Sequence, residues 1–336
     1  MEPEIDSVLF AVPLDYPMFT ELDILGVSHL VNLSGRQAIL ELPRLGEESD
    51  RAVLLPPQSA VEQLSNMVEL WGKLTPYGNG LLAEIHAVLF KVPCSAKVDW
   101  DVSTDQVGGE DVANLGQEIH MWLDSFITWI WGLTSQSLDK NHPDPKMIHR
   151  NSTNLVQVAT AGNRSSHPAV VSSLDPIVVS FDGYPSSEQA VNSDVAVIAA
   201  ARAGSTPPTV IELLASARMF CRRGDRRRAI VDAGAVAEAA LTHLSSTPPS
   251  GKETLGRLVN NSPIVPGDTT ANLVDPRNDA VHRNIAPSFD ITNRAIEIVE
   301  ELAARAEPDV IQVDSLRYFN RPARRDLVII RPPETG

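Results

Sequence analysis

The sequence predicts an α+β protein with two domains, an acidic mixed domain at residues 1–204 and an all-helical domain at residues 205–336. A chain of 336 residues is long enough to bury two separate cores. Short runs rich in Val, Ile and Leu fill the first part, whereas apolar residues at three- and four-residue spacings dominate the second. Residues 204–208, Gly-Ser-Thr-Pro-Pro, lie between these patterns and are typical of a domain boundary.

The acidic domain is expected to contain both strands and helices. Its β-rich runs predict strands at residues 8–12, 27–33, 37–42, 52–55, 82–92, 155–161 and 177–181. Helical periodicity marks residues 59–70, 110–133 and 194–203. The helix at 110–133 carries Trp122, Trp129 and Trp131 within ten residues. Base stacking is one interpretation of this aromatic stripe, but an aromatic stripe at helical spacing favours core packing.

Capping residues define the first helices of the second domain. Thr209 and Glu212 match a capping box, in which the threonine accepts from backbone amides at the start of a helix. Gly224 and Asp225 end that helix and cap the next one, at residues 226–244. The buried stripe of this second helix is expected to comprise Ile230, Ala233, Ala237, Ala240 and Leu241.

Three further segments complete a predicted bundle of four or five helices. They are a short helix from Glu253, the segment at 273–284 and a helix at 288–306. The buried face of the last helix is expected to comprise Ile291, Ala295, Ile298, Val299 and Leu302. Residues 317–336 form a basic, proline-rich tail with strand character at 327–330.

Charge is distributed unevenly along the chain. Residues 1–204 contain 11 Lys and Arg against 26 Asp and Glu, so they carry the whole net charge of −15. Residues 205–336 contain 17 of each sign and are neutral. They include an arginine cluster, six arginines within eleven residues: Arg218, Arg222, Arg223, Arg226, Arg227 and Arg228. The cluster is either a phosphate-contacting surface or a solvated helical face that pairs with nearby acids.

Composition argues against several classes of protein. No apolar run has the length of a membrane-spanning helix, and the acidic amino terminus lacks the basic region of a secretory signal. Cys94 and Cys221 fit neither a disulfide framework nor a metal site, which favours a reducing cytoplasm. No Walker loop, Gly-x-Ser-x-Gly or HExxH motif occurs, so neither a metal nor a cofactor is expected. His86 and His120 are expected to be satisfied structural residues.

The segment at residues 273–284, LVDPRNDAVHRN, combines an arginine, an amide and a histidine. Arg277 and His282 are separated by four residues, and Asn278 directly follows the arginine. RNA cleavage without a metal requires a base for the 2′-hydroxyl, a cation for the developing phosphorane and an acid for the leaving 5′-oxygen. Histidine suits proton transfer because its ordinary pKa of about 6.5 lies near neutral pH. Arginine binds phosphate through a permanently charged fork.

Helical geometry constrains how these residues meet. Asn278 and His282 are four residues apart and share a helix face, whereas Arg277 lies about 140° around the axis from His282. Arg277 therefore reaches the same site through its long side chain or because a helix begins there, and Pro276 favours a helix start at this point. One histidine cannot be free base and protonated acid at once, so two facing copies are the economical arrangement.

The motif, together with the helical pair at residues 215–244, resembles the HEPN superfamily of helical domains over residues 205–306. Many members are metal-independent ribonucleases with an Arg-x4–6-His motif, which implies a homodimeric endoribonuclease with a cleft shared by two subunits. The resemblance implies that Arg277 binds phosphate, His282 transfers protons and Asn278 positions one or the other. Pro276 departs from the family's usual helical lead-in. Where the family often has glycine after the motif, Asn284 suits the same left-handed turn.

Two functions are compatible with these residues. One is an RNA endonuclease, in a toxin or phage-defence setting as the resemblance implies, whose acidic domain senses a trigger, inhibits the nuclease or binds a protein. The other is a non-catalytic module that dimerises through the bundle and recognises a ligand through the acidic domain. The RNA-binding side chains are expected to be Arg222, Arg223, Arg226, Arg227 and Arg283. Asp232 and Glu238 either orient His282 or pair with the arginine cluster, and pairing is favoured.

Overall fold

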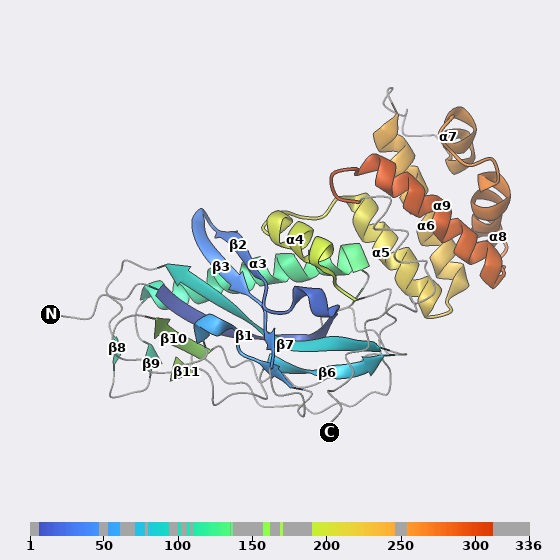
Figure 1. Cartoon of the computed structure of the whole chain (residues 1–336). Coiled ribbons are helices and arrows are strands. Elements are labelled where there is room, and N and C mark those ends of the chain that lie inside the picture. The colour runs from blue at the N-terminus through green and yellow to red at the C-terminus, as the bar shows by residue number, and fades with distance from the viewer. Residues whose placement is uncertain are drawn as a thin grey trace, which may run out of the picture. The chain divides into compact units, whose positions relative to one another are not determined.

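The described residues mix α-helices with an antiparallel sheet, which confirms the α+β prediction. The computed structural model describes residues 7–46, 53–60, 71–77, 80–93, 100–101, 106–107, 110–134, 136, 157–161, 169–170, 190–245 and 254–311. They cluster in two compact units, both of which appear in Figure 1. Of the described residues, the first unit takes those up to 130, residue 136 and those at 157–205, and the second takes 131–134 and those from 206 onward.

A seven-stranded sheet is the framework of the first unit. The strands are β1 (Ser7–Thr20), β2 (Ser28–Leu33), β3 (Arg36–Glu41), β6 (Gly72–Tyr77), β7 (Gly80–Pro93), β10 (Gln157–Ala161) and β11 (Ala169–Val170). Their order is β11-β10-β1-β7-β3-β2, with β6 also pairing with β7, and every pairing is antiparallel. The long strands β1 and β7 are rich in Val, Leu, Ile and Phe, and most of their described side chains are buried.

Shorter elements connect these strands and add two helices. The short strands are β4 (Arg44–Leu45), β5 (Leu54–Leu55), β8 (Trp100–Asp101) and β9 (Gln106–Val107). The helical elements are the 3-10 turns η1 (Leu22–Ile24) and η2 (Gln58–Ala60) and the helices α3 (Glu110–Thr134) and α4 (Ser193–Arg202). The helices predicted at 110–133 and 194–203 are confirmed, whereas residues 61–70 and the strand predicted at 177–181 lie outside the described residues.

Two of the three tryptophans of α3, Trp122 and Trp129, belong to the core of the first unit, whereas Trp131 is half-buried and falls in the second unit. Trp122 lies edge-on to Phe90 of β7, with ring centroids 5.5 Å apart, and stacks on Phe126 at 5.3 Å. Trp129 is buried, and its Nε1–H donates to the carbonyl oxygen of Ser205 at 2.9 Å. The prediction of core packing is confirmed for these residues, because no ring face of Trp122 or Trp129 is left for stacking with a base.

Every described element of the second unit is helical. The helices are α5 (Thr209–Arg222), α6 (Arg226–Leu244), α7 (Leu255–Asn261), α8 (Asp275–His282) and α9 (Phe289–Ala306), with a π-helical turn, η5 (Thr270–Val274), before α8. Figure 1 shows α5, α6 and α9 side by side. The whole predicted stripe of α6 is buried, and so are Ala295, Ile298, Val299 and Leu302 of α9, whereas Ile291 is half-buried. No helix in the described part of the chain is long and apolar enough to cross a membrane.

The predicted helix caps are correct at one junction and wrong at another. Gly224 has a left-handed φ of 77°, and the Asp225 side chain accepts from the amide of Arg228 at 3.1 Å, as expected. The capping box at Thr209 is wrong: Pro208 is the capping residue of α5, and no side chain caps that end. Pro208 has an extended ψ of 145° at φ −56°, so it occupies the capping position and Thr209 is the first helical residue.

Candidate functional site

The three motif residues lie on the short helix α8. The helix begins at Asp275, so Pro276 lies in its first turn, as predicted. The π-helical turn η5, which was not predicted, leads directly into it, and Val274 and Asp275 have right-handed helical dihedral angles. The amide of Asp275 donates to the carbonyl of Thr270, five residues earlier. Such a widened turn accommodates a proline, which lacks an N–H and crowds the carbonyl of the preceding turn.

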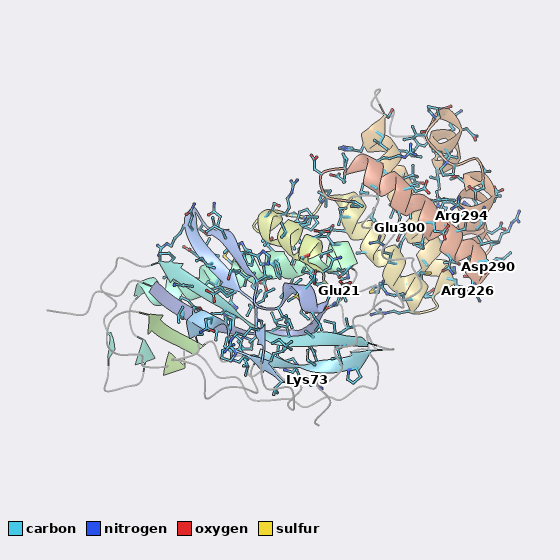
Figure 2. The ribbon with its side chains drawn as sticks, in the orientation of Figure 1. Glu21, Lys73, Arg226, Asp290, Arg294 and Glu300 are labelled. Carbon is cyan, nitrogen blue, oxygen red and sulfur yellow. The ribbon has the colours of Figure 1, made fainter. Side chains whose placement is uncertain are left out.

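Asp268 anchors the beginning of this helical run. Arg294 of α9 donates to both carboxylate oxygens of Asp268, from Nε at 2.8 Å and from Nη2 at 3.2 Å. The side-chain amide of Asn272 donates to the same carboxylate at 3.2 Å. Hydrogen bonds from Arg294 hold the pKa of Asp268 below its ordinary range. Figure 2 labels Arg294 on α9, so the segment that leads into the motif is fastened to that helix.

The side chain of Arg277 lies against α6 at Gly234. A methyl group added at residue 234 would lie 2.9 Å from Arg277 Cγ and 3.4 Å from its Nε. Carbon atoms in contact are normally about 3.5–4.0 Å apart, so only glycine at position 234 leaves room for this side chain. The Nε–H of Arg277 is buried there, and it has no acceptor among the described residues.

Two long contacts hold the other end of the guanidinium. Nη2 of Arg277 lies 3.5 Å from Glu238 Oε1, and Nη1 lies 3.4 Å from Asn278 Oδ1. Both distances exceed those of strong charge-assisted hydrogen bonds, which are about 2.7–2.9 Å. Arg277 is 27% exposed and Glu238 38% exposed, so solvent reaches this end. The guanidinium is therefore oriented, but most of its donors are weakly engaged.

His282 is the last residue of α8 and is exposed. The amides of Arg283 and Ile285 both donate to the carbonyl of Asp279, and Asn284 is left-handed with φ 58°. The prediction that Asn284 provides the helix-ending turn is confirmed. The structure brings Asn278 to Arg277, but within the described residues no hydrogen bond joins His282 to either of them.

Arg227 fastens the end of α8 that carries His282. Its Nε donates to the carbonyl oxygen of Ala280 at 3.0 Å, in the last turn of α8, where carbonyls lack helical partners. Arg227, near the start of α6, contacts Ala280 near the end of α8. Gly234 and Glu238, further along α6, contact Arg277 near the start of α8. The two helices therefore run in opposite directions at this contact, and one stripe of α6 holds both ends of the motif.

The other members of the arginine cluster have different surroundings. Arg218 is buried and pairs with Glu300 of α9 at 2.8 Å, so it belongs neither to a phosphate surface nor to a solvated face, the two alternatives considered for the cluster. Arg228 is exposed, lies 3.6 Å from Asp225 and sits over the Phe220 ring at 5.2 Å. The half-buried members are Arg222, Arg223 and Arg226, the last labelled at the start of α6 in Figure 2.

The other charged residues near the motif, Arg283, Asp232 and Glu238, each have an ion-pair or hydrogen-bond partner. Arg283 is 70% exposed and pairs with Asp279, four residues earlier, at 3.0 Å. Asp232 accepts from the hydroxyl of Ser216 at 2.6 Å, while Glu238 faces Arg277. The expectation that Asp232 and Glu238 pair with the arginine cluster is therefore wrong, and Glu238 contacts the arginine of the motif, not the histidine.

A second polar cluster lies in the first unit, on β6 and β7. The buried carboxylate of Glu84 accepts from Thr75 at 3.0 Å and lies 2.8 Å from His86 and 3.3 Å from Lys73, which Figure 2 labels. Burial acts to raise the pKa of Glu84, but hydrogen bonds and charges from His86, Lys73 and Thr75 outweigh it and lower the pKa. His86 is satisfied by this contact, as predicted.

Neither the metal-ligating side chains of the described ranges nor comparison with known proteins indicates a function. In the described ranges, no three His, Cys, Asp or Glu side chains gather in a way that would hold a metal ion. Comparison of the chain with protein-family models, with curated proteins and with solved structures gives no match. The case for a functional site therefore depends on Arg277, Asn278, His282 and the helix that faces them.

Proposed function

We propose that the second unit is an endoribonuclease of the HEPN type that cleaves RNA without a metal ion and acts as a homodimer. In this proposal Arg277 binds the scissile phosphate and stabilises the developing charge, His282 transfers protons, and Asn278 orients the arginine. The exposed Arg283 contacts the RNA backbone beside the site, together with Arg222, Arg223, Arg226 and Arg227. The acidic first unit then has a sensing or inhibitory role.

The observation that carries this proposal is the position of Arg277. Its stem is confined against Gly234, while Asn278 and Glu238 make only long contacts with its Nη atoms. An oriented guanidinium with weakly engaged donors can form the bidentate bonds that phosphate accepts, without first breaking strong ones. The π-helical turn before α8 adds support, since such turns occur often at functional sites.

Exposed apolar side chains support association of two copies at the motif. Val281 is 41% exposed, Ile285 51% and Phe289 60%, and they flank His282 along the chain. Contiguous exposed apolar patches are typical of interaction surfaces, and these three side chains lie within nine residues of one another along the chain. A second copy covering them would bring a second His282 close to the first, so that one histidine acts as base and the other as acid.

The decisive test is cleavage of structured and single-stranded RNA in EDTA by the full chain. We expect cleavage by the wild type and a loss of at least about 100-fold in His282→Ala, since general acid–base catalysis contributes about that much or more. His243→Ala is the matched control, because His243 is also an exposed histidine in the last turn of a helix. Arg277→Lys is expected to fail as well, because a lysine cannot make the bidentate contact.

Binding separates an inactive site from a wrong proposal. A 2′-O-methyl oligoribonucleotide resists cleavage, so its affinity reports binding alone, and we expect Arg277→Ala to weaken it. The control Arg257→Ala removes an exposed arginine of α7. Wild-type protein that neither cleaves RNA nor binds this oligonucleotide through Arg277 would contradict the proposal and favour a dimerisation or ligand-binding module.

A further inference from the structure

Gly234 occupies an unfavourable position for a glycine. It lies in the middle of α6, where its neighbours are Ala233 and Ala235, in a helix that is otherwise rich in alanine. A glycine in a helix interior costs about 0.5–1 kcal/mol relative to alanine, because the unfolded chain loses more freedom. The three heavy atoms nearest to the position of its missing Cβ all belong to the Arg277 side chain, at 2.9, 3.4 and 3.6 Å. The helix therefore carries its weakest residue at the place where the motif arginine crosses it.

We infer that Gly234 is a positioning residue for Arg277: the missing side chain leaves a slot in α6, and Glu238, one turn later, receives the guanidinium. The slot confines Cγ and Nε, and Glu238 and Asn278 then restrict the rotation of the Nη atoms. Arg277 would otherwise have the rotational freedom of an exposed arginine, which is costly to lose on binding. This positioning role rests on the proposed function, whereas the slot itself does not.

The slot also explains how Arg277 can be held in a fixed direction although it lies on a different face of α8 from His282. On a regular helix Arg277 points about 140° away from His282, so it needs a support to hold its long side chain in a fixed direction. The same stripe of α6 supplies Arg227, which binds the Ala280 carbonyl at the other end of α8. The residues Arg227, Gly234 and Glu238 together fix how far the guanidinium lies from the helix end that bears His282.

A double-mutant cycle on the stability of the full chain tests the slot. Gly234→Ala, Arg277→Ala and the double variant are unfolded in urea. With Arg277 present, we expect Gly234→Ala to give little gain or a loss, because the new methyl meets Cγ at 2.9 Å. With Arg277→Ala, the same change should raise the folding equilibrium constant about fivefold, the usual advantage of alanine in a helix. Equal gains in both backgrounds would overturn the slot.

Binding of the 2′-O-methyl oligoribonucleotide tests the positioning role. We expect Gly234→Ala to lower the affinity as much as Arg277→Ala does, with no further loss in the double variant. Gly256→Ala is the matched control: this α7 glycine has φ outside the left-handed region, and its added Cβ would make only an ordinary 3.6 Å contact with Val274. It should leave the affinity unchanged.

The stability cycle and the affinity measurement test different parts of the inference, so either one can contradict its part alone. A non-additive stability cycle with unchanged affinity in Gly234→Ala would keep the slot and overturn its positioning role. If the stability cycle is non-additive but the wild-type protein does not bind RNA, the proposed function is contradicted and the slot remains supported. An affinity loss in Gly234→Ala that persists undiminished in the Arg277→Ala background would show that Gly234 acts by another route and would overturn the inference.

Discussion

At the scale of single residues, Arg218 shows that the same residue type has different roles within one charge run. Arg218 continues the buried stripe of Ile211, Leu214 and Ala215 at helical spacing, while the other arginines of the cluster lie beyond the apolar part of α5. Its Nε pairs with Glu300, and its Nη1 donates to the carbonyl of Leu133 at 3.2 Å. In the sequence, Arg218 differs from the other arginines of the cluster because it lies at helical spacing from the apolar stripe.

Removing one partner of this pair is expected to destabilise the second unit strongly. Arg218→Ala leaves the Glu300 carboxylate buried without its counter-ion, which typically costs about 3–5 kcal/mol. Replacing both partners, as in Arg218→Met with Glu300→Leu, should restore most of the stability. Urea unfolding followed by circular dichroism measures both changes. A single variant within about 0.5 kcal/mol of the wild type would contradict the burial of this pair, since such small effects are typical of exposed sites.

Glu84 is expected to make the first unit sensitive to acid. Its folded-state pKa is lowered below the ordinary value of 4.5, so it binds a proton more readily in the unfolded chain. The stabilising contribution is therefore fully present above pH 4.5 and is lost as the pH falls through the lower folded-state pKa. Melting temperatures measured from neutral pH down to pH 3 should fall more steeply for the wild type than for Glu84→Gln. Parallel curves would exclude this role.

At the scale of elements, apolar periodicity and most end signals predicted the helices, and one capping box did not. The span of α3 follows from apolar spacing, and the start of α6 follows from Gly224 and Asp225; the structure agrees at both. Pro276 lies in the first turn of α8, as predicted, but no residue pattern indicated the π-helical turn before it. The capping box at Thr209 was wrong, because the extended Pro208 occupies the capping position of α5.

The candidate site divides in the same way. The identity of Arg277, Asn278 and His282 follows from the sequence, because it depends on residue types and local spacing. The roles of Gly234, Glu238 and Arg227 do not, because they depend on which face of α6 meets α8, a contact between segments about 40–50 residues apart. A glycine between alanines in a predicted helix was the one local signal available for this contact.

Asp225 is expected to stabilise α6 through its cap. Asp225→Ala removes the acceptor for the Arg228 amide and should cost about 0.5–2 kcal/mol. Asp225→Asn retains a capping oxygen and should remain close to the wild type, although it loses the exposed ion pair with the Arg228 side chain. Urea unfolding of the three proteins separates the cap from the ion pair. Equal losses in both variants would assign the effect to the ion pair instead.

At the scale of the whole molecule, the sign of the net charge is a poor guide to partners. The acidic excess of −15 belongs to residues 1–204, and the remainder of the chain is neutral. Under the proposed function, an RNA phosphate at the surface of the second unit would feel mainly the local arginines, because salt screens charges more than about 8–10 Å away.

If two copies build the site, activity must depend on concentration. The cleavage rate per mole of chain is expected to fall on dilution below the dimer dissociation constant. Phe289→Glu, which places a charge at a 60% exposed apolar side chain beside the motif, should shift this fall to higher concentration. Met121→Glu is the control, because Met121 of the first unit is 69% exposed. Sedimentation of a fully active monomer at every concentration would contradict the dimer.

The π-helical turn before α8 sets the rotational phase of the motif. An α-helix advances about 100° per residue, so deleting one residue from η5 would rotate everything after it by about that angle. Arg277 would turn away from Gly234, and a different side chain of α8 would face α6. The single extra residue in this turn therefore rotates α8 into the orientation in which Arg277 faces Gly234, a residue more than forty positions earlier in the chain.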